Sequence, residues 1–422
     1  MNKKIKTLKG ISSGDYDYIS LITVCAAIFA VLFAMYTFTG KWPWTSGNPY
    51  NSYIIQAQAW LSGHLSVPAE YDGHWNGGAL ELAKFNDKFY VSFPPFPSYV
   101  MLPFVAFGWL KCDGVLNMAF AIAAGAYAFK IAEHFGIKKE RGIILALLLT
   151  IGSNWLFNAQ VPWVWFIAQN MAFTLSLMAV YYALKGKAGL SLAFWACAVG
   201  CRPMQVLYIF VLIYLFYDKY KTDNPDITIV EIIKTKWTCL IPMAVIALSY
   251  MILNAARFGS ITEFGHNYLP EFAEKQQSPY GQFSVHYMSE NIKTLFRLPE
   301  NHTFKNAWEY QGFNGTNIFL ISPVLIAYIA YMARAVIKKE KKNIALYAGI
   351  FVIMVLHVLM ITAHKTMGGL HFGNRYINDI LPFAYLAIAL SLKDRSRFEG
   401  INTVLLFMGA AVNIIGIALY FV

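Results

Sequence analysis

Residues 338–362 read KKEKKNIALYAGIFVIMVLHVLMIT. The last twenty of them hold no Asp, Glu, Lys or Arg, and four lysines stand directly before them. An apolar run of about 20 residues is long enough to cross the ~30 Å hydrocarbon core of a bilayer as an α-helix. Lysines at one end of such a run are typical of its cytoplasmic side. The stretch therefore predicts a membrane-spanning helix that leaves the cytoplasm at its amino-terminal end.

Comparable apolar runs recur along the whole chain of 422 residues, of which 57% are hydrophobic and 14% charged. Soluble domains carry roughly 25% charged residues, so this chain is solvated mainly by lipid. We expect an all-α polytopic membrane protein, a single integral membrane domain over residues 1–422. About eleven spans are predicted, at 19–38, 114–133, 142–158, 163–184, 188–201, 203–217, 238–255, 318–337, 343–362, 379–392 and 400–421.

The distribution of basic residues orients these spans. With the amino terminus in the cytoplasm, 21 of the 34 lysines and arginines fall in cytoplasmic segments, which are short. The net charge of +11 then reflects topology and contact with anionic membrane lipids, and we expect no nucleic-acid partner. The sequence predicts a cell-membrane protein with a cytoplasmic amino terminus and an outer carboxyl terminus.

Two stretches decide this topology. Residues 188–217 are interpreted as two helices broken at Gly200-Cys201-Arg202-Pro203, because one long helix would place the lysines at 338–342 outside. The proline-rich stretch 93–110 is interpreted as an interfacial or re-entrant helix on the outer side.

The outer loops are then residues 39–113, 256–317 and 363–379. In the first loop we expect a short helix at 54–61 and a turn at Ser62-Gly63-His64. Residues 78–95 resemble a β-hairpin with Asn86-Asp87 at its turn, since these residue types favour the backbone that a two-residue hairpin turn needs.

Two motifs in these loops resemble the GT-C superfamily of membrane glycosyltransferases, which includes protein O-mannosyltransferases and lipid A aminoarabinose transferases. Tyr90-Val-Ser-Phe-Pro-Pro-Phe-Pro97 is similar to the Tyr…Pro-Pro element that closes the first loop in that superfamily. The block from Gly368 to Pro382 resembles the glycine-rich Phe-Gly-x-Arg-Tyr…Pro block of many bacterial members.

The resemblance implies transfer of a hexose or pentose from a polyprenyl-phosphate donor to a glycan, lipid or protein acceptor in the cell envelope, at the extracytoplasmic face. It also implies that a carboxylate in the first outer loop acts as general base. Asn48 or Asn51 stands where that acid is usual, so we expect Glu81 to be the base, with Asp72 second. The alternatives are a solvated strand glutamate for Glu81 and a turn residue for Asp72.

A cationic clamp for the donor phosphate is the second expectation. Arg375 is the first candidate, because its planar fork suits phosphate and the glycines around it allow close approach. Arg202 is the second, and His371 and Lys365 are further candidates. The alternative for Arg375 is an arginine at the membrane edge, and the alternative for Arg202 is a helix-breaking Arg-Pro cap. Residues expected to line the cavity or hold the acceptor are Asn51, Tyr90, His266, Tyr376 and Asp379.

No spacing of His, Asp and Glu marks a metal site, and no cofactor is expected. A divalent cation held by Glu81 or Asp72 and the donor phosphate remains an alternative. Two other classes compete with the enzyme: a catalytically silent accessory membrane protein, which the asparagines at the acid position favour, and a lipid-linked-sugar transporter or flippase, which would carry charged residues inside its spans.

Overall fold

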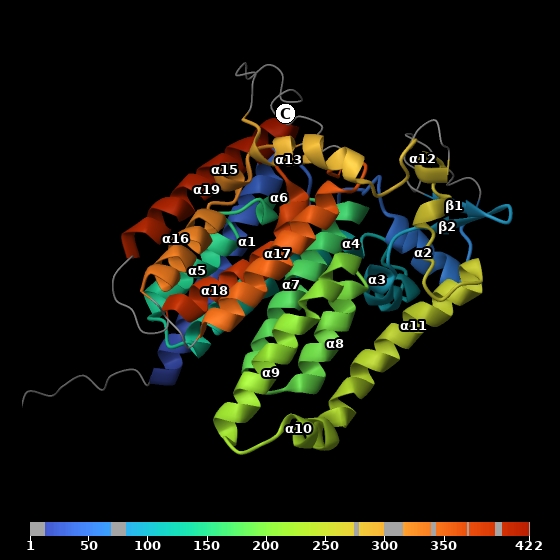
Figure 1. Ribbon diagram of the computed structural model, residues 1–422. Helices are drawn as coiled ribbons and strands as arrows, with labels where there is room; N and C mark the ends of the chain where they lie inside the picture. The colour runs from blue at the N-terminus through green and yellow to red at the C-terminus, as the bar shows by residue number, and fades with distance from the viewer. Residues whose placement is uncertain are drawn as a thin grey trace, which may run out of the picture.

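The computed structural model describes residues 13–68, 82–273, 278–298, 315–338, 343–368, 371–392 and 399–421. Helices dominate these residues and run in a bundle, with one small β-hairpin at its edge (Figure 1). The description below follows the elements from the bundle to the loops that cover one of its ends.

Within the described residues, six helical stretches are long and apolar enough to cross a bilayer, which makes the chain a multi-pass membrane protein. They are α1 (Ser13–Thr39), α4 (Cys112–His134), α7 (Val164–Leu184), the run formed by α10 (Ile229–Lys236), η3 (Trp237–Leu240) and α11 (Ile241–Phe258), α17 (Ile344–Thr362) and α19 (Glu399–Phe421).

Burial separates central helices from peripheral ones. Of the 18 most apolar consecutive residues in α7, 83% are buried, whereas 6% of the corresponding residues in the α10–α11 run are buried. All but one of the residues of α18 (Leu381–Leu392) are buried as well. An apolar helix that is buried all round belongs to the core, and one that is exposed all round faces lipid. The centre of the bundle is therefore α7 and α18, and α11 stands at its periphery, on the right in Figure 1.

Each of the eleven predicted runs overlaps helical residues, but several are broken into shorter pieces, and the number of eleven spans stays a prediction. Seven such pieces lie before α18 in the described part of the chain: α5 (Lys139–Leu149) with α6 (Trp155–Gln160), α8 (Ala188–Val199) with η2 (Pro203–Tyr208) and α9 (Ile209–Asp223), and α15 (Ile318–Ile321) with α16 (Val324–Ile337). The predicted break between residues 188 and 217 is confirmed, because α8 ends at Val199 and the chain turns before Pro203.

The elements of the first outer loop follow the prediction closely. They are α2 (Ser52–Leu61), β1 (Leu82–Phe85), β2 (Lys88–Val91) and α3 (Phe96–Ala106). Asn86 and Asp87 both have positive φ, 49° and 57°, as a type I′ turn requires. At 11 residues, α3 spans only about 16 Å at 1.5 Å per residue, which is too short to cross a bilayer.

The second outer loop packs against the first. Its elements are η4 (His266–Tyr268), α12 (Pro270–Ala273), η5 (Val285–Tyr287) and α13 (Met288–Phe296). The ring of Phe85 in β1 lies 4.7 Å from the ring of Tyr268. The second loop also contacts the third, because Phe283 forms a β-bridge with His364. The hairpin, α12 and α13 gather at the upper end of the bundle in Figure 1, and α10 lies at the opposite end.

Candidate functional site

Two arginines from distant parts of the sequence meet at one tyrosine near the loop-bearing end of the bundle. Arg202 lies in the turn between α8 and η2, and Arg375 opens η7 (Arg375–Ile380). Their guanidinium carbons lie 4.7 and 4.5 Å from the ring centroid of Tyr376. Guanidinium groups at this distance from an aromatic ring are attracted by its quadrupole, so the ring fixes both cations in place.

An ion pair holds Arg202. Its Nε and Nη2 each lie 3.0 Å from Oδ2 of Asp379, whose side chain is fully buried, whereas the Arg202 side chain is 20% exposed. Oδ1 of Asp379 accepts a hydrogen bond of 2.9 Å from Gln169. Both carboxylate oxygens are thus engaged. Asp379 anchors Arg202, and a part of the Arg202 side chain remains exposed.

A glycine carbonyl holds Arg375. Nε and Nη2 of Arg375 donate to the carbonyl oxygen of Gly368 at 3.2 and 2.9 Å. Gly368 has φ +110°, and a Cβ built on it would lie 2.7 Å from Nε of Arg375. Only glycine fits this backbone and this close approach. Gly368 therefore lets its own carbonyl oxygen reach the guanidinium of Arg375, and the binding of a phosphate in this glycine-rich segment stays a prediction.

A chain of buried amides extends from this pair into the bundle. Gln169 in α7 donates to Asp379 and, at 2.7 Å, to the carbonyl oxygen of Arg375, and it accepts from Asn158 of α6 at 3.1 Å. Asn117 of α4 donates to the carbonyl oxygen of Asn158 at 3.0 Å. The sequence analysis did not single out these amides. A signal was present, since polar residues inside apolar runs are costly unless they are paired.

Two histidines of the outer loops lie beside the arginines. The rings of His266 and His364 are 6.5 Å apart. Burial, then the proximity of His364, lowers the pKa of His266 to about 4, and Arg202 contributes in the same direction. Burial also lowers the pKa of His364, with smaller contributions from Arg202 and Arg375. Both rings are therefore neutral at pH 7 and can donate or accept hydrogen bonds.

The remaining predicted residues are more scattered. Lys365 pairs with Glu271 at 3.2 Å, and His371 is fully buried. Tyr90 in β2 packs against Phe258, with 5.2 Å between ring centroids. Asn51 precedes α2 without a side-chain cap bond. Glu81 and Asp72, the two predicted bases, lie outside the described residues.

The asparagine at the expected acid position has a carboxylate partner. Asn48 donates to Oδ2 of Asp113 at 2.6 Å and to the carbonyl oxygen of Pro162 at 2.8 Å. Asp113 opens α4 and is only 5% exposed. It stood in the predicted first loop at its far end, and sequence reasoning did not single it out. Asn48 thus ties the two ends of this loop together.

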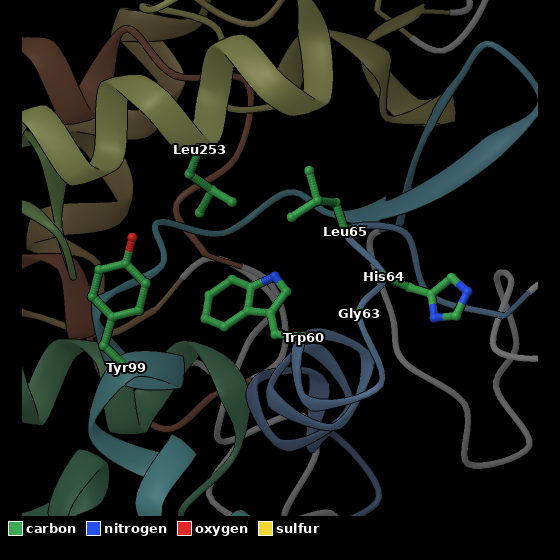
Figure 2. Close-up of a pocket in the computed structure, with 6 residues that line it drawn as sticks. All are labelled: Trp60, Gly63, His64, Leu65, Tyr99 and Leu253. Carbon is green, nitrogen blue, oxygen red and sulfur yellow. The ribbon is translucent and has the colours of Figure 1, made fainter.

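A pocket of about 320 Å³ lies between α2, α3 and α11 (Figure 2). It is lined by Trp60, Gly63, His64, Leu65, Tyr99 and Leu253. Its lining is mainly apolar.

Among the described residues, no group of three His, Cys, Asp or Glu side chains is placed to hold a metal ion. The alternative of a divalent cation at Glu81 or Asp72 concerns residues outside that part of the chain.

One known structure is similar to this chain over nearly its whole length: ArnT from Cupriavidus metallidurans bound to undecaprenyl phosphate. The TM-score is 0.50 and the identity 11%, over 97% of this chain and 76% of that one. The same enzyme in its apo state has a TM-score of 0.49 with equal coverage. No protein-family model and no curated protein matches the sequence. The chain therefore shares the fold of this structure, in agreement with the GT-C-like architecture that its loop motifs predicted; at this identity the likeness shows the fold alone.

Proposed function

We propose that this protein is a membrane glycosyltransferase that moves a sugar from a polyprenyl-phosphate donor to an acceptor at the extracytoplasmic face. The observation that carries the proposal is the pair of arginines around Tyr376, in a fold shared with a transferase whose structure holds undecaprenyl phosphate.

The electrostatics of the pair suit a phosphate. Arg202, Arg375 and Asp379 together carry one net positive charge, and each guanidinium is held by partners within the protein. Donors oriented before the ligand arrives stabilise developing charge without reorganisation, which is the larger part of their effect on rate. Arg202 supplies the accessible face, and Arg375 adds charge from a more buried position.

The reaction requires one base. The bond between the anomeric carbon and the phosphate oxygen breaks, and a bond from that carbon to the acceptor oxygen forms. The polyprenyl phosphate leaves as an anion beside the arginines and needs no proton, while a base takes the proton of the acceptor. Asp379 does not suit this role, because it is fully buried and both oxygens are engaged. Glu81 is the proposed base, with Asp72 second.

Release of undecaprenyl phosphate in proteoliposomes tests the proposal. The donors are undecaprenyl phosphates carrying a labelled hexose or pentose, and an extract of bacterial envelope supplies acceptors. We expect wild-type protein to turn over one of them, and Glu81→Gln to lower turnover about 10²- to 10⁴-fold with donor binding retained. Arg202→Ala and Arg375→Ala should weaken donor binding. Lys293→Ala is the matched control, an exposed cation on α13 paired only at the surface with Glu290.

The catalytically silent alternative has one observation in its favour, the Asn48 side chain at the usual acid position. Wild-type protein that binds undecaprenyl phosphate yet turns over no donor would favour it. Unchanged turnover in both Glu81→Gln and Asp72→Asn would contradict a base in the first loop.

A further inference from the structure

A fully buried histidine, His357, lies within the membrane-spanning helix α17. An ionisable side chain inside a span is costly, so such residues face the interior of the bundle and have polar partners there. The ring of His357 follows this rule. Its Nδ1 faces Tyr208 at the end of η2, and its Nε2 faces Asp379 of η7, the residue that anchors Arg202.

The hydrogen bond to Tyr208 favours one tautomer of this ring. Nδ1 of His357 lies 3.1 Å from the hydroxyl oxygen of Tyr208. If the hydroxyl donates, Nδ1 is the acceptor and Nε2 carries the proton. If Nδ1 donated instead, the buried hydroxyl would lose this acceptor for its own proton, and an unprotonated Nε2 would face a carboxylate. The bond made by one ring nitrogen determines which tautomer is present, so Nε2 carries the proton and points it at Asp379.

Nε2 faces Asp379 without reaching it. The distance from Nε2 to Oδ2 of Asp379 is 3.9 Å, and Nε2 is a buried atom with no hydrogen-bond partner in the described part of the chain. A buried N–H that lacks an acceptor is unfavourable. Oδ2 is already occupied, because Nε of Arg202 donates to it at 3.0 Å and Nη2 of Arg202 lies 3.0 Å from the same oxygen. One carboxylate oxygen accepts about two hydrogen bonds, so Arg202 keeps His357 at a distance.

We propose that His357 is a positioning residue that donates to Asp379 when a phosphate binds Arg202; this inference rests on the proposed function. A phosphate that binds the guanidinium competes with Oδ2 for the same donors, and it draws at least one of them away. A buried carboxylate that loses a donor is destabilised. A shift of about 1 Å brings the Nε2–H of His357 within hydrogen-bond distance of Oδ2. His357 thus gains an acceptor, and Asp379 keeps its donors while Arg202 turns to the ligand.

Two substitutions that each keep the place of one ring nitrogen test this role. The side-chain amide of glutamine reaches to about the position of Nε2, and that of asparagine to about the position of Nδ1. We expect His357→Asn to weaken the binding of undecaprenyl phosphate about tenfold, as for the loss of one hydrogen bond to a charged group. His357→Gln should retain most of the affinity. Leu356→Ala, at a 47% exposed position of the same helix, is the control and should bind as the wild type does.

Binding is measured on full-length protein in nanodiscs, by competition between undecaprenyl phosphate and a diazirine-bearing form of it. Thermal unfolding in detergent shows whether each variant is folded. A spectroscopic signature in the wild-type protein does not depend on the variants. With isotope-labelled histidine, the magnetic resonance signal of His357 is the one that His357→Gln lacks. We expect the Nε2–H tautomer in the free protein, and a downfield shift of that proton when undecaprenyl phosphate binds, because a hydrogen bond to a carboxylate forms.

The outcomes separate the inference from the function. If wild-type protein bound undecaprenyl phosphate and the Nε2 proton did not shift, His357 would have no positioning role. Equal affinities of His357→Asn and His357→Gln, whether lowered or not, would have the same meaning. In these cases donor binding would stand and the inference would be wrong. If the wild-type protein bound no undecaprenyl phosphate, the proposed function would be overturned together with the inference.

Discussion

Tyr376 explains how two guanidinium groups share one small site. Like charges at short range repel, and repulsion is strongest where water is excluded. Here Asp379 offsets one charge, and the ring of Tyr376 attracts both cations. The residual positive charge is what an anionic ligand would meet. The site is thus preorganised by partners that a sequence-based view of single arginines does not include.

Gly368→Ala should disturb this arrangement directly. The added methyl would stand 2.7 Å from Nε of Arg375, on a backbone with φ +110°. We expect Arg375 to be displaced and the affinity for undecaprenyl phosphate to fall about tenfold or more, with the protein still folded. Binding of undecaprenyl phosphate is measured by its competition with undecaprenyl phosphate that carries a photoactivatable diazirine. Gly349→Ala is the control, because the Cβ there meets no atom within 4 Å, and equal affinities in the two variants would contradict the role of Gly368.

Acid should destabilise the outer loops through His266. The folded pKa of about 4 lies below the ordinary value of 6.5, so between these values the unfolded chain binds a proton that the folded chain does not. Stability conferred by the neutral ring is therefore complete above about pH 6.5 and is lost as the pH falls toward 4. His364 and Arg202 face the same ring and add to the effect.

We expect the free energy of unfolding to fall by about 1–3 kcal/mol between pH 6.5 and 4. Each pKa unit corresponds to about 1.4 kcal/mol, and the partial exposure of His266 reduces the total. Thermal unfolding in detergent from pH 7.5 to 4.5 measures it. His266→Gln should flatten the acid limb, while His286→Gln, an exposed histidine of the same loop, should leave it unchanged. A wild-type curve that is flat over this range would show that His266 titrates normally.

At the scale of elements, helix breaks position the site. The break between α8 and η2 brings Arg202 to Asp379, and the break between α5 and α6 places Asn158 beside Gln169. Non-helical backbone within a membrane bundle is tolerated where protein groups satisfy it. The buried amides do this here: Asn117 donates to the carbonyl oxygens of both Asn158 and Ala159.

Asn170→Ala tests the weight of this network. Asn170 in α7 donates to the side chain and backbone of Asn117 at 2.7 and 2.8 Å and accepts from Trp155 at 3.1 Å. Its loss leaves buried polar groups unpaired, and we expect about 2 kcal/mol of destabilisation, at roughly 0.6 kcal/mol for a hydrogen bond within a membrane and more for an orphaned group. Thermal unfolding in detergent measures this. Thr37→Ala, an exposed hydroxyl bonded within α1, should cost under about 0.5 kcal/mol. If both variants lost a similar amount of stability, the buried amide network would contribute no more than an exposed hydrogen bond.

The sequence predicted elements better than contacts. Apolar length and the turn pair Asn86-Asp87 are local signals, and the helices and the hairpin lie where those signals placed them. The pairing of Arg202 with Asp379 joins residues 177 positions apart, and no local pattern encodes it. Asp113 was missed for the same reason, because its partner Asn48 lies 65 positions away. Each arginine could be named from its motif, but not their meeting at Tyr376.

At the scale of the whole molecule, the bundle has two unlike ends. The hairpin, α12 and α13 lie at one end, and α10 lies at the other (Figure 1). Cytoplasmic segments of membrane proteins are enriched in Lys and Arg. Lys138 and Lys139 at the start of α5, and the lysines at the end of α9 and in α10, fit that side. With that orientation the proposed site would face outward, and this orientation stays a prediction.

Cysteine accessibility decides this orientation. In a variant whose five native cysteines are replaced by serine or alanine, single cysteines at Lys138 and Lys338 should react with a membrane-impermeant maleimide only after the cells are opened, because both positions belong to predicted cytoplasmic segments. A cysteine at Asn267, an exposed residue of η4, should react in intact cells. Lys84, exposed in β1, is the matched control for the outer side because it belongs to the first outer loop. If Lys338→Cys reacted in intact cells while Lys138→Cys did not, the segment 188–217 would not reverse the chain. Arg202 and Arg375 could then not meet at one face, in conflict with their shared contact with Tyr376.

If all four positions gave the opposite pattern, the whole bundle would be inverted in the membrane. The donor would then have to be sought among lipids of the inner leaflet.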